Sequence, residues 1–219
     1  MLRICDDLPV DLLFVLGCPP LDEIHRVGVE VSQLYRVFER AVEDGSFAGN
    51  GVSGGWSIVQ PGCVEDALCA AERRAVETAE PTPYGREVIV AAQEAGMPVA
   101  VVSNNSPGAV FAYLAAHRLA GHISPVVGRA YADPDRMKPN PEPILQAARV
   151  LGEQAGRCVL VGDSLSDIEG ARAAGVRTVG YANRPTKVGL FRDAGADVVI
   201  TGMGALAHVL LKRRVGDNT

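Results

Sequence analysis

The sequence predicts a doubly wound α/β fold, in which helices cover both faces of a parallel sheet. Two observations predict it. Short apolar runs rich in β-branched residues recur along the chain, and helical patterns of about ten residues alternate with them. Strands that alternate with helices of this length form βαβ units with right-handed crossovers, so the strands lie parallel. A chain of 219 residues accommodates one such domain with a small insertion.

The first strand is expected at residues 11–17, which hold an unbroken apolar run. The Cys-Pro-Pro segment that follows ends this strand, because proline cannot donate to a ladder of hydrogen bonds. Residues 21–82 then carry two helical patterns, at 24–41 and 64–79, on either side of a glycine-rich stretch. We therefore predict a small helical insertion between the first and second strands of the core.

After this insertion, glycine and proline mark most of the element boundaries. Gly96 and Gly175 end helices, and Pro107 lies in the first turn of one. Residues 133–143 are polar and rich in proline, so they predict a loop, which carries Lys138. Strands are expected at 99–102, 123–127, 159–161, 177–181 and 198–200, and helices at 88–95, 106–119, 144–151, 168–174, 186–194 and 203–212.

Composition and charge exclude several classes of function. Hydrophobic residues make up 47% of the chain and charged residues 21%, as in ordinary globular proteins. A net charge of -5 gives no reason to expect a nucleic acid or an anionic membrane as partner. No apolar run is long enough to span a bilayer, and the N-terminus lacks the basic start of a signal peptide. We therefore expect a cytoplasmic protein.

The cysteines do not indicate a metal site. The five cysteines, at positions 5, 18, 63, 69 and 158, show no paired spacing of the kind that metal ligands have. In the cytoplasm they are expected to be reduced. Cys158 falls inside a predicted strand, so we interpret it as a small hydrophobic core residue.

The most informative stretch is an acidic turn between a predicted strand and a predicted helix. Asp163 is the first side chain beyond the strand, and Asp167 follows four residues later, with Ser164 or Ser166 as the helix cap. Ligands of open α/β sheets bind at the carboxyl ends of the strands. Two carboxylates there favour a hard cation such as Mg²⁺, with Asp163 as a ligand. The alternative is that both are merely loop carboxylates that cap the helix.

Polar side chains follow three separate strand ends, which a doubly wound sheet brings to one crevice. Ser103 and Asn104 follow one strand, Lys138 precedes another, and Asp163 with Asp167 follows a third. A hydroxyl, an amide and a lysine suit the oxygens of a phosphoryl group, and the carboxylates suit its cation. The pattern predicts a crevice for phosphate or a small phosphorylated metabolite, although each residue alone also has an ordinary structural explanation.

These segments resemble a known family. The stretches VAVVSNN, MKPNPEPI and VLVGDSLSDIEGARAAGV are similar to motifs two, three and four of the haloacid dehalogenase superfamily, in particular its phosphoglycolate-phosphatase-like members. The resemblance implies that Ser103 binds the phosphoryl group, Lys138 balances charge at the nucleophile and Asp163 coordinates Mg²⁺. Asp167 would support the metal or Lys138. It also implies a Rossmann-like core of residues 1–20 and 83–219, with 21–82 as a helical cap.

The first motif departs from the family pattern, which is a strand ending in Asp-x-Asp-Gly-Thr. Val15 occupies the position of the nucleophilic aspartate, and Gly17 that of the aspartate that acts as acid and base. Valine cannot attack phosphorus or bind a metal, and Gly17 keeps only a backbone carbonyl for Mg²⁺. Loss of a covalent nucleophile commonly lowers the rate by several orders of magnitude. We therefore expect impaired or absent aspartyl-phosphate chemistry and weakened Mg²⁺ binding.

Three functional hypotheses follow. In the first, the chain is a degenerate phosphatase that binds a phosphorylated metabolite or a protein partner. In the second, it is an active hydrolase in which Cys18 is the nucleophile, or Asp22 or Asp167 activates a water. In the third, it is a non-catalytic structural or regulatory subunit, which binds neither phosphate nor Mg²⁺. Turnover of a phosphate monoester separates the second hypothesis from the others, and phosphate binding separates the first from the third.

Overall fold

The sheet is parallel and has β1 near its middle. The computed structural model describes residues 13–16 and 61–216. Within these residues six strands follow the order β3-β2-β1-β4-β5-β6, and every neighbouring pair is parallel. The strands are β1 (Leu13–Leu16), β2 (Val99–Val102), β3 (Val126–Val127), β4 (Cys158–Gly162), β5 (Arg177–Tyr181) and β6 (Val198–Ile200).

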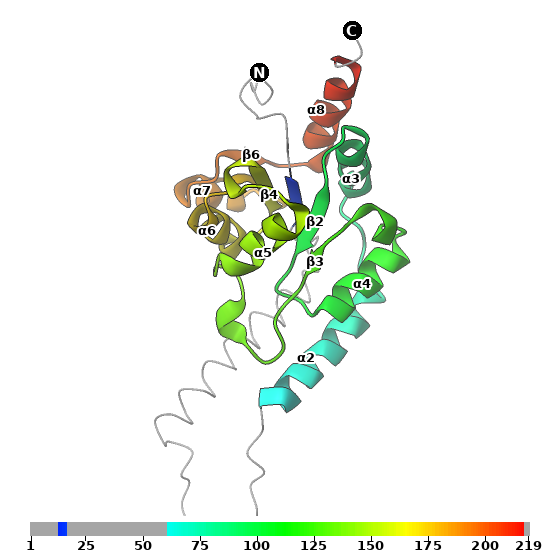
Figure 1. The fold of residues 1–219 in the computed structure, drawn as a ribbon, viewed down its shortest axis with the longest axis vertical. Coiled ribbons are helices and arrows are strands. Elements are labelled where there is room, and N and C mark those ends of the chain that lie inside the picture. The colour runs from blue at the N-terminus through cyan, green and yellow to red at the C-terminus, as the bar shows by residue number, and fades with distance from the viewer. Residues whose placement is uncertain (1–12, 17–60, 217–219) are drawn as a thin grey trace, which may run out of the picture.

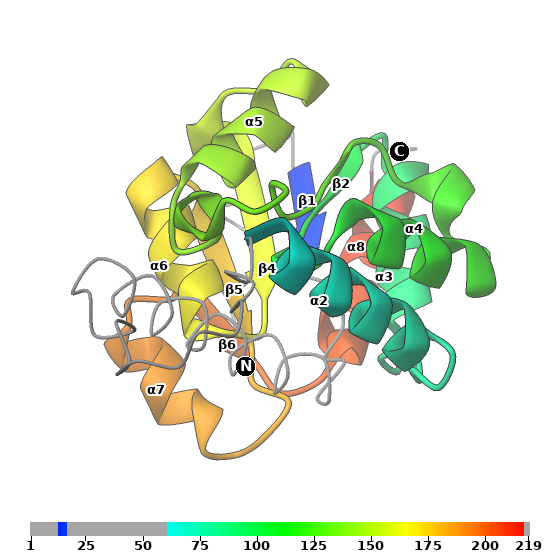
Figure 2. The ribbon, with the colours of Figure 1, turned by 90° about the horizontal axis from the view of Figure 1, so that it is seen from below.

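Helices cover both faces of this sheet, as predicted. Figure 2 shows α3, α4 and α8 on one side of the sheet and α5 and α6 on the other, and in Figure 1 α2 runs alongside α4. The helices are α2 (Pro61–Val76), α3 (Gly85–Glu94), α4 (Pro107–Ala116), α5 (Glu142–Leu151), α6 (Leu165–Ala174), α7 (Lys187–Asp193) and α8 (Met203–Gly216), with short 3₁₀ turns at Ala120–His122, Pro134–Arg136 and Ala155–Arg157.

The alternation of side chains along the strands divides the core into two layers. Val159 and Val161 of β4 pack with residues of α3, α4 and α8, whereas Cys158 and Leu160 pack with residues of α5 and α6. Successive side chains of a strand point to opposite faces, and here both faces are apolar. Cys158 is fully buried in the second layer, which confirms its interpretation as a core residue.

Most predicted boundaries agree with the structure to within a few residues. The strand predicted at 123–127 is reduced to β3, because Pro125 has no N–H to donate to a ladder. The helix predicted at 88–95 begins earlier, at Gly85. The cap helix predicted at 24–41 lies outside the described residues. Of the predicted cap 21–82, the structure describes α2 and the turn after it, so the domain boundary stays a prediction.

No helix in the described part of the chain is both long enough and apolar enough to cross a membrane.

Candidate phosphate-binding crevice

The acidic turn after β4 is built around the side chain of Asp167. Its Oδ2 accepts hydrogen bonds from Asp163 N at 3.1 Å, Ser164 N at 3.0 Å and Ser164 Oγ at 2.6 Å. Ser164 Oγ in turn accepts from Asp167 N, which completes a capping box at the start of α6. A Cβ on Gly162 would lie 2.3 Å from Asp167 Cβ, so only glycine allows the carboxylate to fold back over the strand end.

Lys138 binds the other oxygen of the same carboxylate. Its Nζ donates to Asp167 Oδ1 at 2.6 Å and to the carbonyl oxygen of Val102 at 2.7 Å. Lys138 is 7% exposed and Asp167 2%, so this is a buried ion pair with further hydrogen bonds on both partners. Because Val102 ends β2 and Asp167 lies on α6, the lysine joins two of the strand ends that the sequence placed in one crevice.

The loop after β2 is attached to the Lys138 loop through the Asn104 side chain. Asn104 Nδ2 donates to Lys138 O at 3.0 Å, and Asn104 Oδ1 accepts from Lys138 N at 2.9 Å. Ser103, which is 5% exposed, accepts a hydrogen bond from Asn105 N through its Oγ and keeps its hydroxyl hydrogen for another acceptor. The amide of Asn104 therefore holds the two loops together in this structure, and the Ser103 hydroxyl is the donor group of the loop.

Asp163 faces two groups that the sequence analysis did not predict. Lys187 Nζ donates to Asp163 O at 2.7 Å and lies 3.5 Å from Asp163 Oδ2. Asn183 Nδ2 lies 3.4 Å from the same carboxylate oxygen. Both residues follow β5, so the rule that polar residues at strand ends converge would have indicated them.

A buried charge cluster beneath the Ser103 loop was also missed. Arg129 is 6% exposed and forms 2.6 Å ion pairs with Glu65 and Glu72 of α2. Arg129 Nη1 also donates to Asn104 O at 2.7 Å, and Glu72 Oε2 accepts from Ser106 N at 2.8 Å. This cluster, which we call the Arg129 cluster, ties α2 to both sides of the Ser103–Asn104 loop. In sequence its only signal is two glutamates spaced two helical turns apart.

Of the segment assigned to the first motif, the structure describes Val15. It lies in β1, where its backbone is level with Ala100 of β2 and Leu160 of β4. Gly17, Cys18 and Asp22 lie outside the described residues. Position 15 therefore belongs to the strand that separates the Ser103 loop from the Asp163 turn, and the assignment of its side chain to the nucleophile position stays a prediction.

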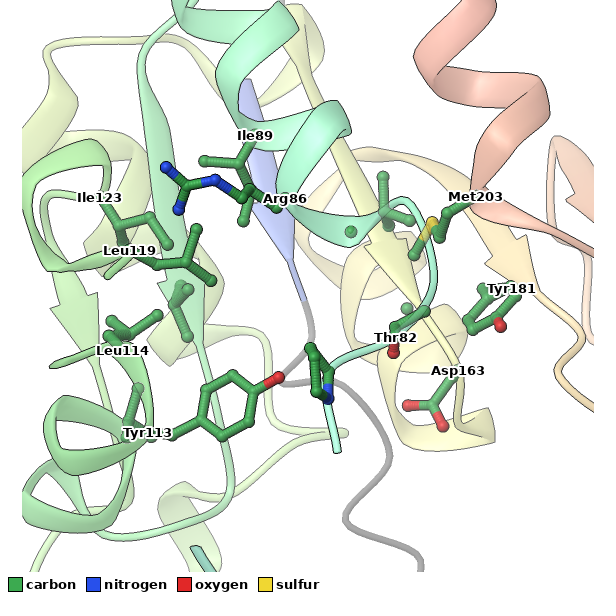
Figure 3. A pocket seen from close by; sticks show the side chains of 16 residues that line it. Thr82, Arg86, Ile89, Tyr113, Leu114, Leu119, Ile123, Asp163, Tyr181 and Met203 are labelled. Carbon is green, nitrogen blue, oxygen red and sulfur yellow. The ribbon is translucent and has the colours of Figure 1, made fainter. Parts of the chain in front are cut away.

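An open pocket with an empty volume of about 640 Å³, part of it open to solvent, lies beside the crevice. Figure 3 shows Asp163 and Tyr181 on one side of this pocket and Leu114, Leu119 and Ile123 on the other. Burial and the nearby Asp163 charge raise the pKa of the Tyr181 hydroxyl, so this group stays neutral at neutral pH. The pocket thus joins the acidic turn to an apolar surface.

Among the described residues, the donor set of the crevice does not suit a tightly held divalent cation. Within the described residues no group of three or more histidine, cysteine, aspartate or glutamate side chains could hold a metal. Asp163 contributes one carboxylate, which already faces the Lys187 ammonium, and both oxygens of Asp167 accept other hydrogen bonds. Mg²⁺ demands a nearly octahedral oxygen shell and is repelled by an adjacent ammonium. The predicted ligand Gly17 lies outside the described residues.

The fold and this strand-end network define a phosphatase-like α/β protein, and comparison with known proteins agrees. The family model described as haloacid dehalogenase-like hydrolase matches residues 54–175. The chain belongs to this family.

Curated relatives match part of their own length. The phosphoglycolate phosphatase of Escherichia coli (strain K12) is 35% identical over 98 residues, which cover 45% of this chain and 38% of that protein. The plasmid phosphoglycolate phosphatase of Cupriavidus necator is 33% identical over 132 residues, which cover 58% of this chain and 54% of that protein. The chain thus spans between two fifths and about half of the length of these relatives.

Solved structures show the same fold. A conserved haloacid dehalogenase-like protein of unknown function from Agrobacterium tumefaciens superposes with a TM-score of 0.60 at 25% identity, over 92% of this chain and 98% of that one. CbbY from Rhodobacter sphaeroides, determined in complex with phosphate, superposes with a TM-score of 0.64 at 19% identity, over 90% and 96%. The same Rhodobacter protein also has a structure with xylulose-(1,5)bisphosphate.

Proposed function

We propose that this chain is a degenerate phosphatase, which binds phosphate or a small phosphorylated metabolite but has little or no aspartyl-phosphate phosphatase activity. The observation that carries the proposal is a contrast between two parts of the crevice. Asn104, Lys138 and Asp167 belong to one connected network at the strand ends, and Ser103 precedes Asn104 in the same loop. The strand between them, β1, has valine at position 15, which has no lone pair to attack phosphorus.

Relatives and neighbours support the choice of ligand. Two relatives are phosphoglycolate phosphatases, and a neighbour of the same fold binds phosphate and a sugar bisphosphate. The Ser103 hydroxyl and the cations of the crevice are suitable donors for such oxygens. We further propose that Mg²⁺ binds weakly at most. Among the described residues, Asp163 is the carboxylate proposed as its ligand, and this carboxylate already faces the Lys187 ammonium. A cytoplasmic location, with no nucleic acid or membrane as partner, completes the proposal.

The test is hydrolysis of a generic phosphate monoester in the presence of Mg²⁺. The wild-type chain should show no turnover above the background, because it lacks the covalent nucleophile. A Val15→Asp/Gly17→Asp double variant should gain Mg²⁺-dependent turnover, since it restores the family pattern. Adding Ser103→Ala to this double variant should remove most of the gain, which would assign the activity to the crevice rather than to a contaminant.

Wild-type turnover that persists through further purification steps would overturn the proposal. The candidates would then be Cys18 as a nucleophile, or Asp22 or Asp167 as a base acting on water. Unfolding of the double variant is detected by its circular dichroism and leaves the wild-type measurement as the deciding result.

A further inference from the structure

Lys187 brings a second ammonium group to the acidic turn. It is the first residue of α7, and its Nζ donates to Asp163 O at 2.7 Å. The same ammonium lies 3.5 Å from Asp163 Oδ2, and Asn183 Nδ2 lies 3.4 Å from that oxygen. Asp163 is 4% exposed, so its carboxylate is largely shielded from water and faces a cation of the chain.

The position of this ammonium is fixed by the core beneath it. Lys187 Nζ lies 5.9 Å from the centroid of the Phe191 ring, one turn further along α7. Phe191 is 1% exposed and packs directly on Gly180 of β5, where a Cβ would lie 2.9 Å from the ring. An ammonium at this distance from the face of a buried aromatic ring is attracted to it by a cation–π interaction. The ring therefore favours the position of the ammonium at the turn.

Among the described residues of the crevice, each carboxylate has an ammonium beside it. Asp163 and Asp167 carry two negative charges, and Lys187 and Lys138 carry two positive charges, with one ammonium beside each carboxylate. A divalent cation on Asp163 would be placed next to the Lys187 ammonium and would leave these side chains with an excess of positive charge. The same arrangement, by contrast, suits an anion, which gains from both ammonium groups.

We propose that Lys187 takes the place of a divalent cation at Asp163, so that the crevice binds a phosphate-type oxyanion without metal. This inference rests on the proposed function. An ammonium has three N–H donors, and the contacts with Asp163 leave capacity for an oxygen of the ligand. The ligand class is inorganic phosphate or a phosphate monoester, and the Ser103 hydroxyl and Lys187 are the donors of the chain.

The experiment titrates inorganic phosphate into the full chain and measures Kd from the rise of Tm with phosphate concentration. The titration is made once in excess EDTA and once in excess MgCl₂ at matched ionic strength. Wild type should give the same Kd in both. Lys187→Met should weaken phosphate binding in EDTA on the order of tenfold, the worth of one hydrogen bond to a charged group. MgCl₂ should restore part of this loss, because the Asp163 carboxylate then no longer faces the Lys187 ammonium.

Two further variants distinguish charge from folding. Lys187→Arg keeps the cation and should retain most of the affinity, whereas Lys212→Met removes an exposed lysine of α8 and should change nothing. Two results would overturn the role of Lys187 but not the phosphate-binding crevice. In one, wild type binds phosphate only in MgCl₂; in the other, Lys187→Met binds phosphate as tightly as wild type. Failure of wild type to bind phosphate in either buffer would overturn the proposed function itself.

Discussion

Replacing Arg129 by methionine should destabilise the protein strongly. Arg129 is the cation between Glu65 and Glu72, which are 4% and 1% exposed. Both ion pairs are 2.6 Å long, so the guanidinium balances two carboxylates that water does not reach. Methionine fills part of the volume but leaves these carboxylates without a counter-charge. Breaking a buried ion pair by removing one partner costs about 3–5 kcal/mol.

The loss should be visible in thermal unfolding. For a protein of this size, each kcal/mol lowers Tm by about 2–4 °C, so Arg129→Met should melt roughly 6–20 °C below wild type. The control is Arg149→Met, which removes an arginine paired with Glu142 on the surface, where the two side chains are 58% and 43% exposed. An exposed pair is worth at most about 1 kcal/mol, so this variant should melt within a few degrees of wild type.

A second comparison separates charge from packing in the Arg129 cluster. Adding Glu65→Gln and Glu72→Gln to Arg129→Met removes both uncompensated charges while keeping the side-chain volumes, so part of the lost Tm should return. Calorimetric or circular-dichroism melts at neutral pH are sufficient. If Arg129→Met melts no lower than Arg149→Met, or if the triple variant melts lower than the single one, the electrostatic account of this cluster is wrong.

Two further predictions concern the crevice and the core. Gly162→Ala should lower the free energy of unfolding by about 1–3 kcal/mol or more and weaken phosphate binding, because its Cβ would lie 2.3 Å from Asp167 Cβ. The control is Gly156→Ala, whose Cβ meets nothing within 4 Å. Equal Tm values for the two variants would contradict the argument. Burial, helped by the nearby Glu153 charge, raises the pKa of the Cys158 thiol from 9.0 to about 11. The folded chain therefore keeps this proton when the unfolded chain has lost it, so the free energy of unfolding should fall between about pH 9 and 11. In Cys158→Ala, the free energy of unfolding measured by urea titration should fall less steeply over this pH range than in wild type. An equally steep fall in the variant and in wild type would refute the assignment.

The sequence could predict the crevice because parallel strands end at one edge of the sheet. Ser103, Lys138 and Asp167 are far apart in the chain, yet each belongs to a segment that follows a strand. Ser103 directly follows β2, Lys138 lies in the proline-rich loop after β3, and Asp167 lies in the first turn of the helix after β4. Residues that share this edge must lie close together whatever the loops do. In the structure Lys138 is hydrogen-bonded to Asp167, to Val102 O and to Asn104, the neighbour of Ser103.

The strand-end rule extends to Lys187, which follows β5, although its contact with Asp163 also depends on how Phe191 packs α7 on that strand. The Arg129 cluster, by contrast, depends on how helices dock, which sequence patterns do not specify. Arg129 meets Glu65 and Glu72 across separations of 64 and 57 residues. To predict such pairs one must know how α2 and the loop after β3 are placed relative to each other. Neither the periodicity of charges nor the spacing of residues gives this placement.

The position of β1 in the sheet has a consequence for the residue at position 15. In the described sheet β2 and β4 do not pair with each other, so β1 is the strand that bridges the two halves. That bridge is made by backbone hydrogen bonds, which are indifferent to whether position 15 carries a carboxylate or a methyl-rich side chain. A strand at this place in the sheet needs apolar β-forming residues whatever chemistry takes place at its end. The fold by itself therefore favours valine over an acid at position 15.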